Sequence, residues 1–137
     1  MPLKTPVHRL ELTEFGYDGE YVDVRAGASN ADLREFALLE RQRQEYQRDV
    51  DRAKEAGEPE PEAPDELRNS TDALLARIVV DCSFKDSGRV DAPAFWGTVD
   101  DDLLKAALIA AWVRKRVERR RKLGLDAPDF TGTSGSA

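Results

Sequence analysis

Histidine, cysteine and paired polar side chains carry out most protein catalysis, and these residues are sparse in this chain. Its 137 residues include one histidine, His8, and one cysteine, Cys82. A nucleophile needs an adjacent activating base, and no cysteine or serine lies near His8 in the sequence. Cys82 lies in an apolar alternation, as buried cysteines often do. We therefore expect a solvated His8 and a buried, unreactive Cys82.

Three consecutive carboxylates, Asp100, Asp101 and Asp102, could be taken for a cation site. Successive helical positions point about 100° apart, however, so three in a row cannot converge on one ion. We expect these residues to cap a helix instead. The dispersed glycines do not form a phosphate-binding loop. The sequence therefore predicts no metal, no cofactor and no enzymatic activity.

A basic run occupies residues 114–122, where seven of nine residues are Lys or Arg. Such a run could follow a phosphate backbone. The chain is acidic overall, with a net charge of −6, and no aromatic residues for base stacking interrupt the run. Such a run is usually a solvated helix end, and an acidic protein partner or the chain's own acidic linker would satisfy its cations as well as a nucleic acid would. The residues assigned to this contact are Arg114, Lys115, Arg119, Arg120 and Arg121.

We expect the N-terminal region to form a β-hairpin. Val7–Leu12 and Glu20–Arg25 have the composition of two short strands, and the segment between them is rich in turn residues. Val22 and Val24 alternate with polar residues, so we expect both side chains to face the core.

A long helix should follow the hairpin. Ser29 can cap it, with Asp32 three residues later, so the helix should begin near Asn30. One face carries Phe36, Leu39, Arg43, Tyr46, Val50 and Ala53. We expect this face to pack on another helix of the chain; the alternative is an arm that binds a partner or a second copy. Glu55–Pro64 alternates proline with glutamate and should be an extended linker.

The second half should begin with a short helix capped by Asp65. Its apolar side carries Leu67, Thr71, Leu74, Leu75 and Ile78. From Ile78 onward the apolar residues alternate, with Val80 and Cys82 on one face. The segment Arg77–Val80 fits the end of a helix or the start of a strand, and its β-branched residues favour the strand. Asp86–Ser87–Gly88 indicates a turn.

The final helix has the clearest pattern. Thr98, with Asp101 three residues later, repeats the capping pattern at its start. Leu103–Val113 is apolar nearly all round apart from Lys105, and Gly124 suits the helix end. A helix of this kind is either part of a core or a surface that awaits a partner.

These elements predict an α+β, mainly helical fold with an N-terminal β-hairpin, three helices and one or two further short strands. The length suits a single small domain, over residues 1–124, followed by a flexible, disordered tail over residues 125–137. The longest apolar run is about half of the roughly 20 residues that cross a bilayer. A single cysteine and no apolar signal segment suit the reducing cytoplasm.

Two patches carry further information: Tyr17–Arg25 (YDGEYVDVR) and Ala76–Ala111 (ARIVVDCSFKDSGRVDAPAFWGTVDDDLLKAALIAA). Together they resemble the tail assembly chaperones of long-tailed, siphovirus-like bacteriophages. Members often have an early strand pair, then helices, then a strand of hydrophobic-Asp-Trp-polar-Phe type, a glycine turn and a Leu-Leu-Ala helix. Here Cys82 stands where a tryptophan is common.

The resemblance implies a holdase in the bacterial host cytoplasm that coats the phage tape measure protein and helps tail tube protein polymerise around it. A homo-oligomer would suit this role, and the family often extends the product by an alternative reading frame. Such a chaperone needs apolar surface surrounded by charge. The residues that we expect to form this surface are Phe95, Trp96, Leu104, Leu108, Ile109 and Trp112, with Phe36, Leu39 and Tyr46 as a second stripe. The alternative is that both sets form the core.

Two other functions fit the sequence. A structural virion protein, such as a head–tail connector or tail component, would remain in purified particles. A small nucleic-acid-binding protein would use the basic helix end, and its salt-sensitive binding would vanish when Arg119, Arg120 and Arg121 are neutralised.

Overall fold

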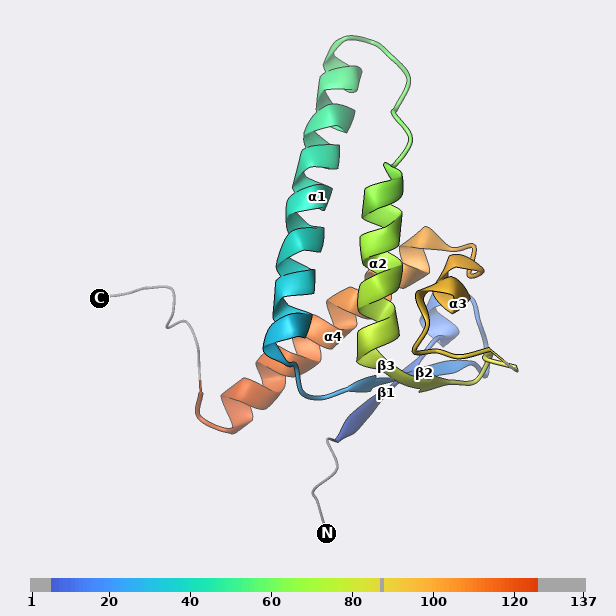
Figure 1. Ribbon diagram of the computed structural model, residues 1–137, viewed down its shortest axis with the longest axis vertical. Helices are drawn as coiled ribbons and strands as arrows, with labels where there is room; N and C mark the ends of the chain where they lie inside the picture. Colours follow the sequence, from blue (N-terminus) through green and yellow to red (C-terminus); the bar gives the residue numbers. More distant parts are fainter. Residues whose placement is uncertain (1–5, 87, 126–137) are drawn as a thin grey trace.

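The chain folds into an α+β domain in which a three-stranded antiparallel sheet lies against helices (Figure 1). The computed structural model describes residues 6–86 and 88–125. The elements are β1 (Val7–Glu11), the 3-10 helix η1 (Thr13–Phe15), β2 (Tyr21–Arg25), α1 (Asn30–Glu55), α2 (Asp65–Ile78), β3 (Val79–Cys82), α3 (Pro93–Gly97) and α4 (Asp102–Lys122). The predicted fold class, the hairpin and one further strand are confirmed. The short helix α3 adds a fourth α-helix to the three expected. Apart from Leu125, the predicted tail lies outside the described residues.

The sheet has the order β1-β2-β3. Val22 and Val24 of β2 are fully buried, as predicted. Asp23 pairs with Asp81, but Val24 pairs with Val79, so Val80 is an extra residue in β3. Such a bulge shifts the alternation of side chains. Val80 is therefore 48% exposed, whereas Val79 and Cys82 are buried, so the predicted placement of Val80 on the same face as Cys82 is wrong.

Helix α1 and helix α2 form an antiparallel hairpin with the linker at its tip (Figure 1), and we call this hairpin the arm. The predicted cap is confirmed, because Ser29 and Asp32 form a complete capping box. Leu39, Val50 and Ala53 of the predicted face are buried. The predicted packing of this face within the chain is therefore confirmed.

Two helix starts differ from the prediction. Pro64, not Asp65, precedes the first turn of α2 as its N-cap. Asp101, not Thr98, caps α4, and its side chain accepts a hydrogen bond from the Leu104 N–H at 3.0 Å. Thr98 instead lies at the end of α3, where its hydroxyl donates to the Phe95 carbonyl. Because Thr98 ends α3, Asp101 caps α4 in its place.

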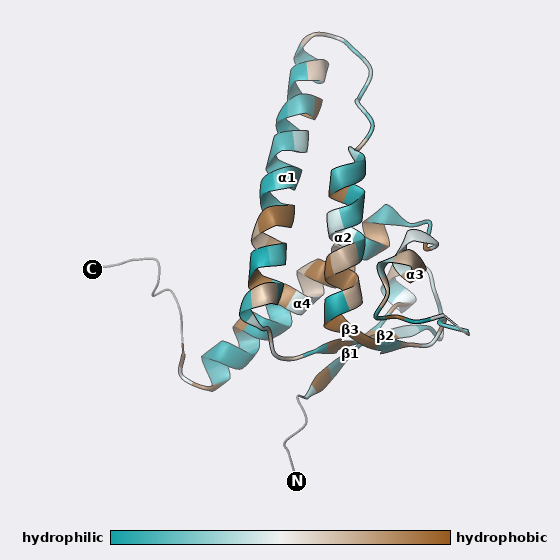
Figure 2. Ribbon diagram, in the orientation of Figure 1, coloured by the Kyte–Doolittle hydropathy of each residue, from teal (hydrophilic) through white to brown (hydrophobic). Residues whose placement is uncertain are grey.

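The core lies where the base of the arm, α4 and the sheet meet. Hydropathy colouring places the apolar residues there and leaves the outer part of the arm hydrophilic (Figure 2). Helix α2 ends at Ile78 and β3 begins at Val79, so the segment Arg77–Val80 contains both the helix end and the strand start. At the end of α4, Gly124 has a φ of 73°. Its conformation allows the Leu125 N–H to bond the Arg120 carbonyl and close the helix, as predicted for Gly124.

Candidate protein-interaction surfaces

The six residues expected to form a partner-binding surface lie in or against the core. Trp96, Leu108, Ile109 and Trp112 are each at most 1% exposed, and Leu104 is 4% exposed. Phe95 packs against this core, with its ring 5.1 Å from the Trp96 ring. The apolar middle of α4 is therefore core rather than open surface, because the sheet and the arm cover it.

The second expected stripe is also engaged within the chain. Leu39 is fully buried, and the Phe36 ring meets the Trp112 ring edge to face at 6.1 Å. The Tyr46 hydroxyl donates to the Pro61 carbonyl at 2.8 Å, which ties the linker to α1. Neither apolar stripe is thus open to a partner in this structure.

An open apolar hollow of about 270 Å³ lies instead between the hairpin turn and the start of α4, and we call it the acidic hollow. Its lining residues are Leu12, Tyr17, Glu20, Phe84, Val99, Asp100, Asp101 and Leu104. Apolar side chains supply the floor and carboxylates supply much of the rim. Leu103, the neighbour of Leu104, is 84% exposed. The site combines a hydrophobic seat with negative charge, which suits a segment bearing apolar and basic side chains.

Hydrogen bonds hold the rim of the acidic hollow in place. The Tyr17 hydroxyl donates to the Asp101 carboxylate, which joins the hairpin turn to the cap of α4. This hydrogen bond, together with the Leu104 N–H, holds the pKa of Asp101 below its ordinary value. It likewise raises the pKa of Tyr17. On the opposite side, Glu20 accepts a hydrogen bond from the Ser83 hydroxyl at 2.6 Å. The acidic hollow is therefore preformed, with Asp101 ionised at neutral pH.

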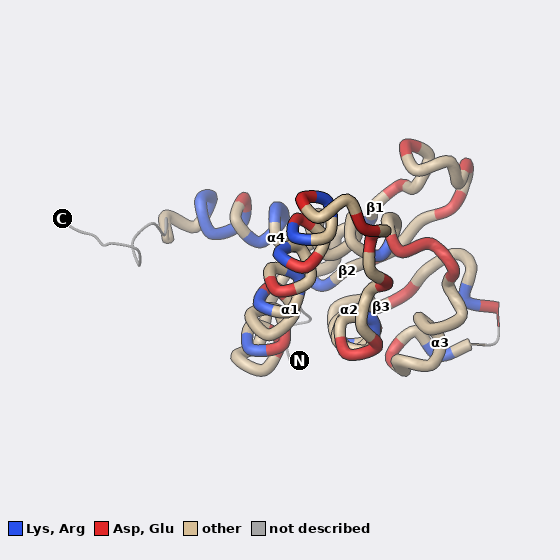
Figure 3. The backbone as a smooth tube through the Cα atoms, turned by 90° about the horizontal axis from the view of Figure 1, so that it is seen from above, with Lys and Arg blue, Asp and Glu red and all other residues tan. Residues whose placement is uncertain are grey.

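The other end of α4 carries the predicted basic run. A second hollow of about 180 Å³, the basic hollow, is lined by Ala26, Gly27, Ala28, Arg116, Arg119, Arg120, Leu123 and Leu125. Leu123 and Leu125 are 60% and 54% exposed. Lys and Arg residues lie along the end of α4, which extends away from the rest of the domain (Figure 3).

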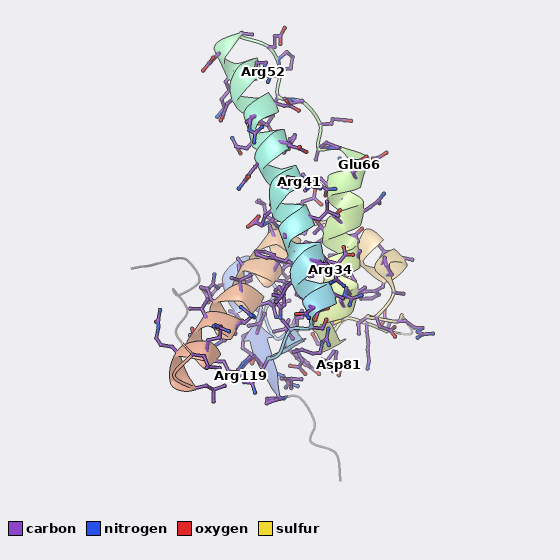
Figure 4. All side chains as sticks on the ribbon, turned by 60° about the vertical axis from the view of Figure 1, so that its left-hand side comes forward. Arg34, Arg41, Arg52, Glu66, Asp81 and Arg119 are labelled. Atoms are coloured by element: carbon purple, nitrogen blue, oxygen red, sulfur yellow. The ribbon has the colours of Figure 1, made fainter. Side chains whose placement is uncertain are left out.

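Only some of the residues predicted to contact an anionic partner line the basic hollow. Arg119 and Arg120 line the basic hollow, whereas Arg114 and Arg121 are exposed beside it. Lys115 lies 3.8 Å from Glu118. Arg119 is at the opposite end of the molecule from Arg52 and the tip of the arm (Figure 4). The proposed contact of the basic run with the chain's own linker, residues 56–64, is therefore not formed.

The remaining residues singled out from the sequence have structural roles. Cys82 is a free, buried thiol as predicted, and burial raises its pKa to about 11. His8 is half-buried on the same face of β1 as Leu10, and its Nε2 is enclosed without a hydrogen-bond partner, so the predicted solvated His8 is wrong. The alternation of β1 turns that ring toward the core.

One buried ion pair was not predicted. Lys105, which interrupts the apolar run of α4, bonds Asp72 of α2 at 2.9 Å, and its side chain is 7% exposed. Paired burial of this kind satisfies a charge that would otherwise be costly in a core. The available signal was a lone lysine within the apolar run Leu103–Val113 of this helix.

Within residues 6–86 and 88–125, no three histidine, cysteine or acidic side chains come together as a metal site. No helix in the same part of the chain is long and apolar enough to span a membrane. Comparisons with protein-family models, with curated protein sequences and with solved structures find no match to this chain.

Proposed function

We propose that this protein is a non-enzymatic tail assembly chaperone of a long-tailed bacteriophage. In this role it binds the tape measure protein in the cytoplasm of the bacterial host and promotes assembly of tail tube protein around it. The observation that carries the proposal is that the two patches with the family resemblance are adjacent in the fold. Tyr21–Arg25 and Val79–Cys82 are neighbouring strands of one sheet, although about fifty residues of helical arm separate them in sequence.

A second contact supports a shared role for these patches. The Tyr21 N–H donates to the Ser83 hydroxyl at 2.8 Å, and the Ser83 N–H donates to the Tyr21 carbonyl at 3.0 Å. The remainder of the second patch continues into α3 and the first half of α4, which supply Trp96, Leu104 and Leu108 to the core. The two patches therefore contribute strands and helices to one core, which they share with the base of the arm.

We assign the tape measure protein to the acidic hollow. Before assembly, a long helical protein exposes apolar faces that a holdase must cover while charge keeps the complex in solution. The acidic hollow offers Leu12, Phe84 and Leu104 as an apolar seat, with Asp100 and Glu20 at its rim. A helix with apolar side chains and flanking lysines or arginines fits this combination.

Co-expression with the tape measure protein tests the proposal. Wild-type protein should move the tape measure protein from the insoluble to the soluble fraction. A double variant, Val99→Glu with Leu103→Glu, should abolish this effect, because it places charge at the mouth of the acidic hollow. The matched control is Val117→Glu, which adds a carboxylate to an exposed position of α4 far from the hollow. Failure of the wild-type protein to solubilise the partner would contradict the proposal.

Nucleic-acid binding is the second candidate, since Arg116, Arg119 and Arg120 come together around the basic hollow. Binding of this kind would weaken steeply with salt. A gel-shift titration with single- and double-stranded DNA separates the two functions. We expect no shift at physiological ionic strength, and a shift that neutralisation of Arg119 removes would favour the second function.

A further inference from the structure

Helix α4 carries opposite charges at its two ends. Asp100, Asp101 and Asp102 lie at its start, and Arg119, Arg120, Arg121 and Lys122 occupy its last turn. The helix has 21 residues, so its ends are about 30 Å apart at 1.5 Å per residue. The two ends of one rigid helix cannot meet. Within one copy, the cations of one end therefore cannot pair with the carboxylates of the other.

The two ends also match in their apolar parts. The acidic hollow is lined by the apolar side chains of Phe84, Val99 and Leu104, and Leu103 beside it is 84% exposed. The basic end presents two exposed leucines, Leu123 and Leu125, beside its arginines. The start of α4 thus has an apolar hollow next to carboxylates, and the end of α4 has exposed apolar side chains next to cations.

The acidic linker is a poorer complement for the basic end. Residues 56–64 contain three glutamates but only alanine, glycine and proline besides. They could neutralise arginine, but they offer no apolar seat for a leucine side chain. Burial of a leucine side chain stabilises a contact more than an exposed ion pair does. The acidic hollow is therefore the better site for this helix end.

We propose that copies of this chain associate head to tail, with the basic end of α4 of one copy seated in the acidic hollow of the next. Leu123 occupies the apolar floor, and Arg119 and Lys122 face the carboxylates of the rim. The contact joins two different surfaces, so each added copy leaves one of each free. The product is an open chain of copies or a ring, not a closed two-fold dimer.

The contact is small, so the association should be weak and sensitive to salt. It needs no phage protein and stands or falls separately from the proposed function. Where the proposed function also holds, the tape measure protein displaces the neighbouring copy from the acidic hollow. Self-association then keeps the apolar seat covered until the partner arrives.

Sedimentation velocity of the full chain tests the proposal. At low salt, the mean mass should rise with protein concentration beyond that of a dimer, and high salt should reverse the rise. Two variants each weaken one surface: Arg119→Gln with Leu123→Ser, and Glu20→Gln with Asp100→Asn. Each should lower the association constant about ten-fold or more. Circular dichroism should show that both retain the helical fold.

The mixture of the two variants gives the decisive result. The first keeps an intact acidic hollow and the second an intact basic end, so a 1:1 mixture should form dimers and nothing larger. The matched control is Arg41→Gln with Arg52→Gln, which removes two cations from the arm and should associate like wild type. A wild-type protein that stays monomeric, or a mixture that forms no dimer, would overturn the proposal. Loss of association on changing Glu58, Glu60 and Glu62 to glutamine would assign the contact to the linker instead.

Discussion

At the scale of single residues, Asp32 joins three segments through one fully buried carboxylate. It accepts hydrogen bonds from the Ser29 N–H at 3.0 Å, from Arg25 at 3.0 Å and from Arg77 at 2.7 Å. The cap of α1 is thereby attached to the end of β2 and to the last turn of α2. This residue fixes the direction in which the arm leaves the sheet.

Replacing Asp32 with asparagine should destabilise the protein by about 3 kcal/mol, because two guanidinium groups lose their counter-charge. Urea unfolding measures the change. Asp49→Asn is the matched control: Asp49 forms an exposed pair with Arg52 at 3.4 Å, and its loss should cost less than about 0.5 kcal/mol. Equal effects of the two substitutions would contradict the assigned role of Asp32.

The same carboxylate gives a pH dependence with a defined sign. Burial opposes ionisation of Asp32, but the Ser29 N–H and the two arginines outweigh it and lower the pKa. The contribution of Asp32 is therefore complete above its unfolded pKa of about 4 and is lost as the pH falls through the lower folded pKa. The difference in stability between wild type and Asp32→Asn should narrow in acid. A difference that is constant from neutral pH down to strong acid would contradict this.

Cys82 should react slowly with thiol reagents in the folded protein. Its pKa of about 11 leaves little thiolate at pH 8, and the reaction should be at least about 100-fold slower than in the urea-unfolded chain. The time course of a chromogenic disulfide reagent measures both rates. Comparable rates in the folded and unfolded states would show that Cys82 is accessible.

At the scale of elements, the start of α4 provides a comparison between two candidate caps. Asp101→Ala should destabilise the protein by about 1 kcal/mol, since it removes the cap of the Leu104 N–H. It also removes the acceptor of the Tyr17 hydroxyl. Thr98→Ala should stay within about 0.5 kcal/mol of wild type. Thermal unfolding monitored by circular dichroism measures both losses of stability. A larger loss for Thr98→Ala than for Asp101→Ala would contradict the assignment of Asp101 as the cap.

Local signals predicted most of the elements, and tertiary contacts decided the rest. The Ser29–Asp32 capping box and the buried Val22 and Val24 follow from patterns within a few residues. The exposed Val80 does not, because the bulge is set by the pairing of β3 with β2. Thr98 and Asp101 are both possible caps in sequence, and the structure places Thr98 at the end of α3 and Asp101 at the start of α4.

At the scale of the whole molecule, the two hollows could not be predicted from the sequence. The acidic hollow combines Leu12 and Tyr17 with Phe84 and Leu104, which lie far apart in the chain. The sequence did indicate the charges at each end of α4, but not that apolar residues open to solvent lie beside them. The apolar middle of α4 was predicted as a partner-binding surface because its hydrophobicity is visible in the sequence. Its burial depends on contacts with the arm and the sheet, which the sequence does not show.

The charged ends of α4 and the charged arm surround a core formed by the sheet, the base of the arm and the middle of α4. Figure 2 shows how much of the arm is hydrophilic beyond its base. In the proposed function, this surface keeps a complex with an apolar partner in solution.

The most direct test of the proposed function is quantitative mass spectrometry of the phage-infected cell lysate alongside purified particles. An assembly chaperone acts and leaves, so we predict that this chain is abundant in the lysate and absent from the particles. Stoichiometric presence in the particles would contradict the account and make the protein a structural part of the virion.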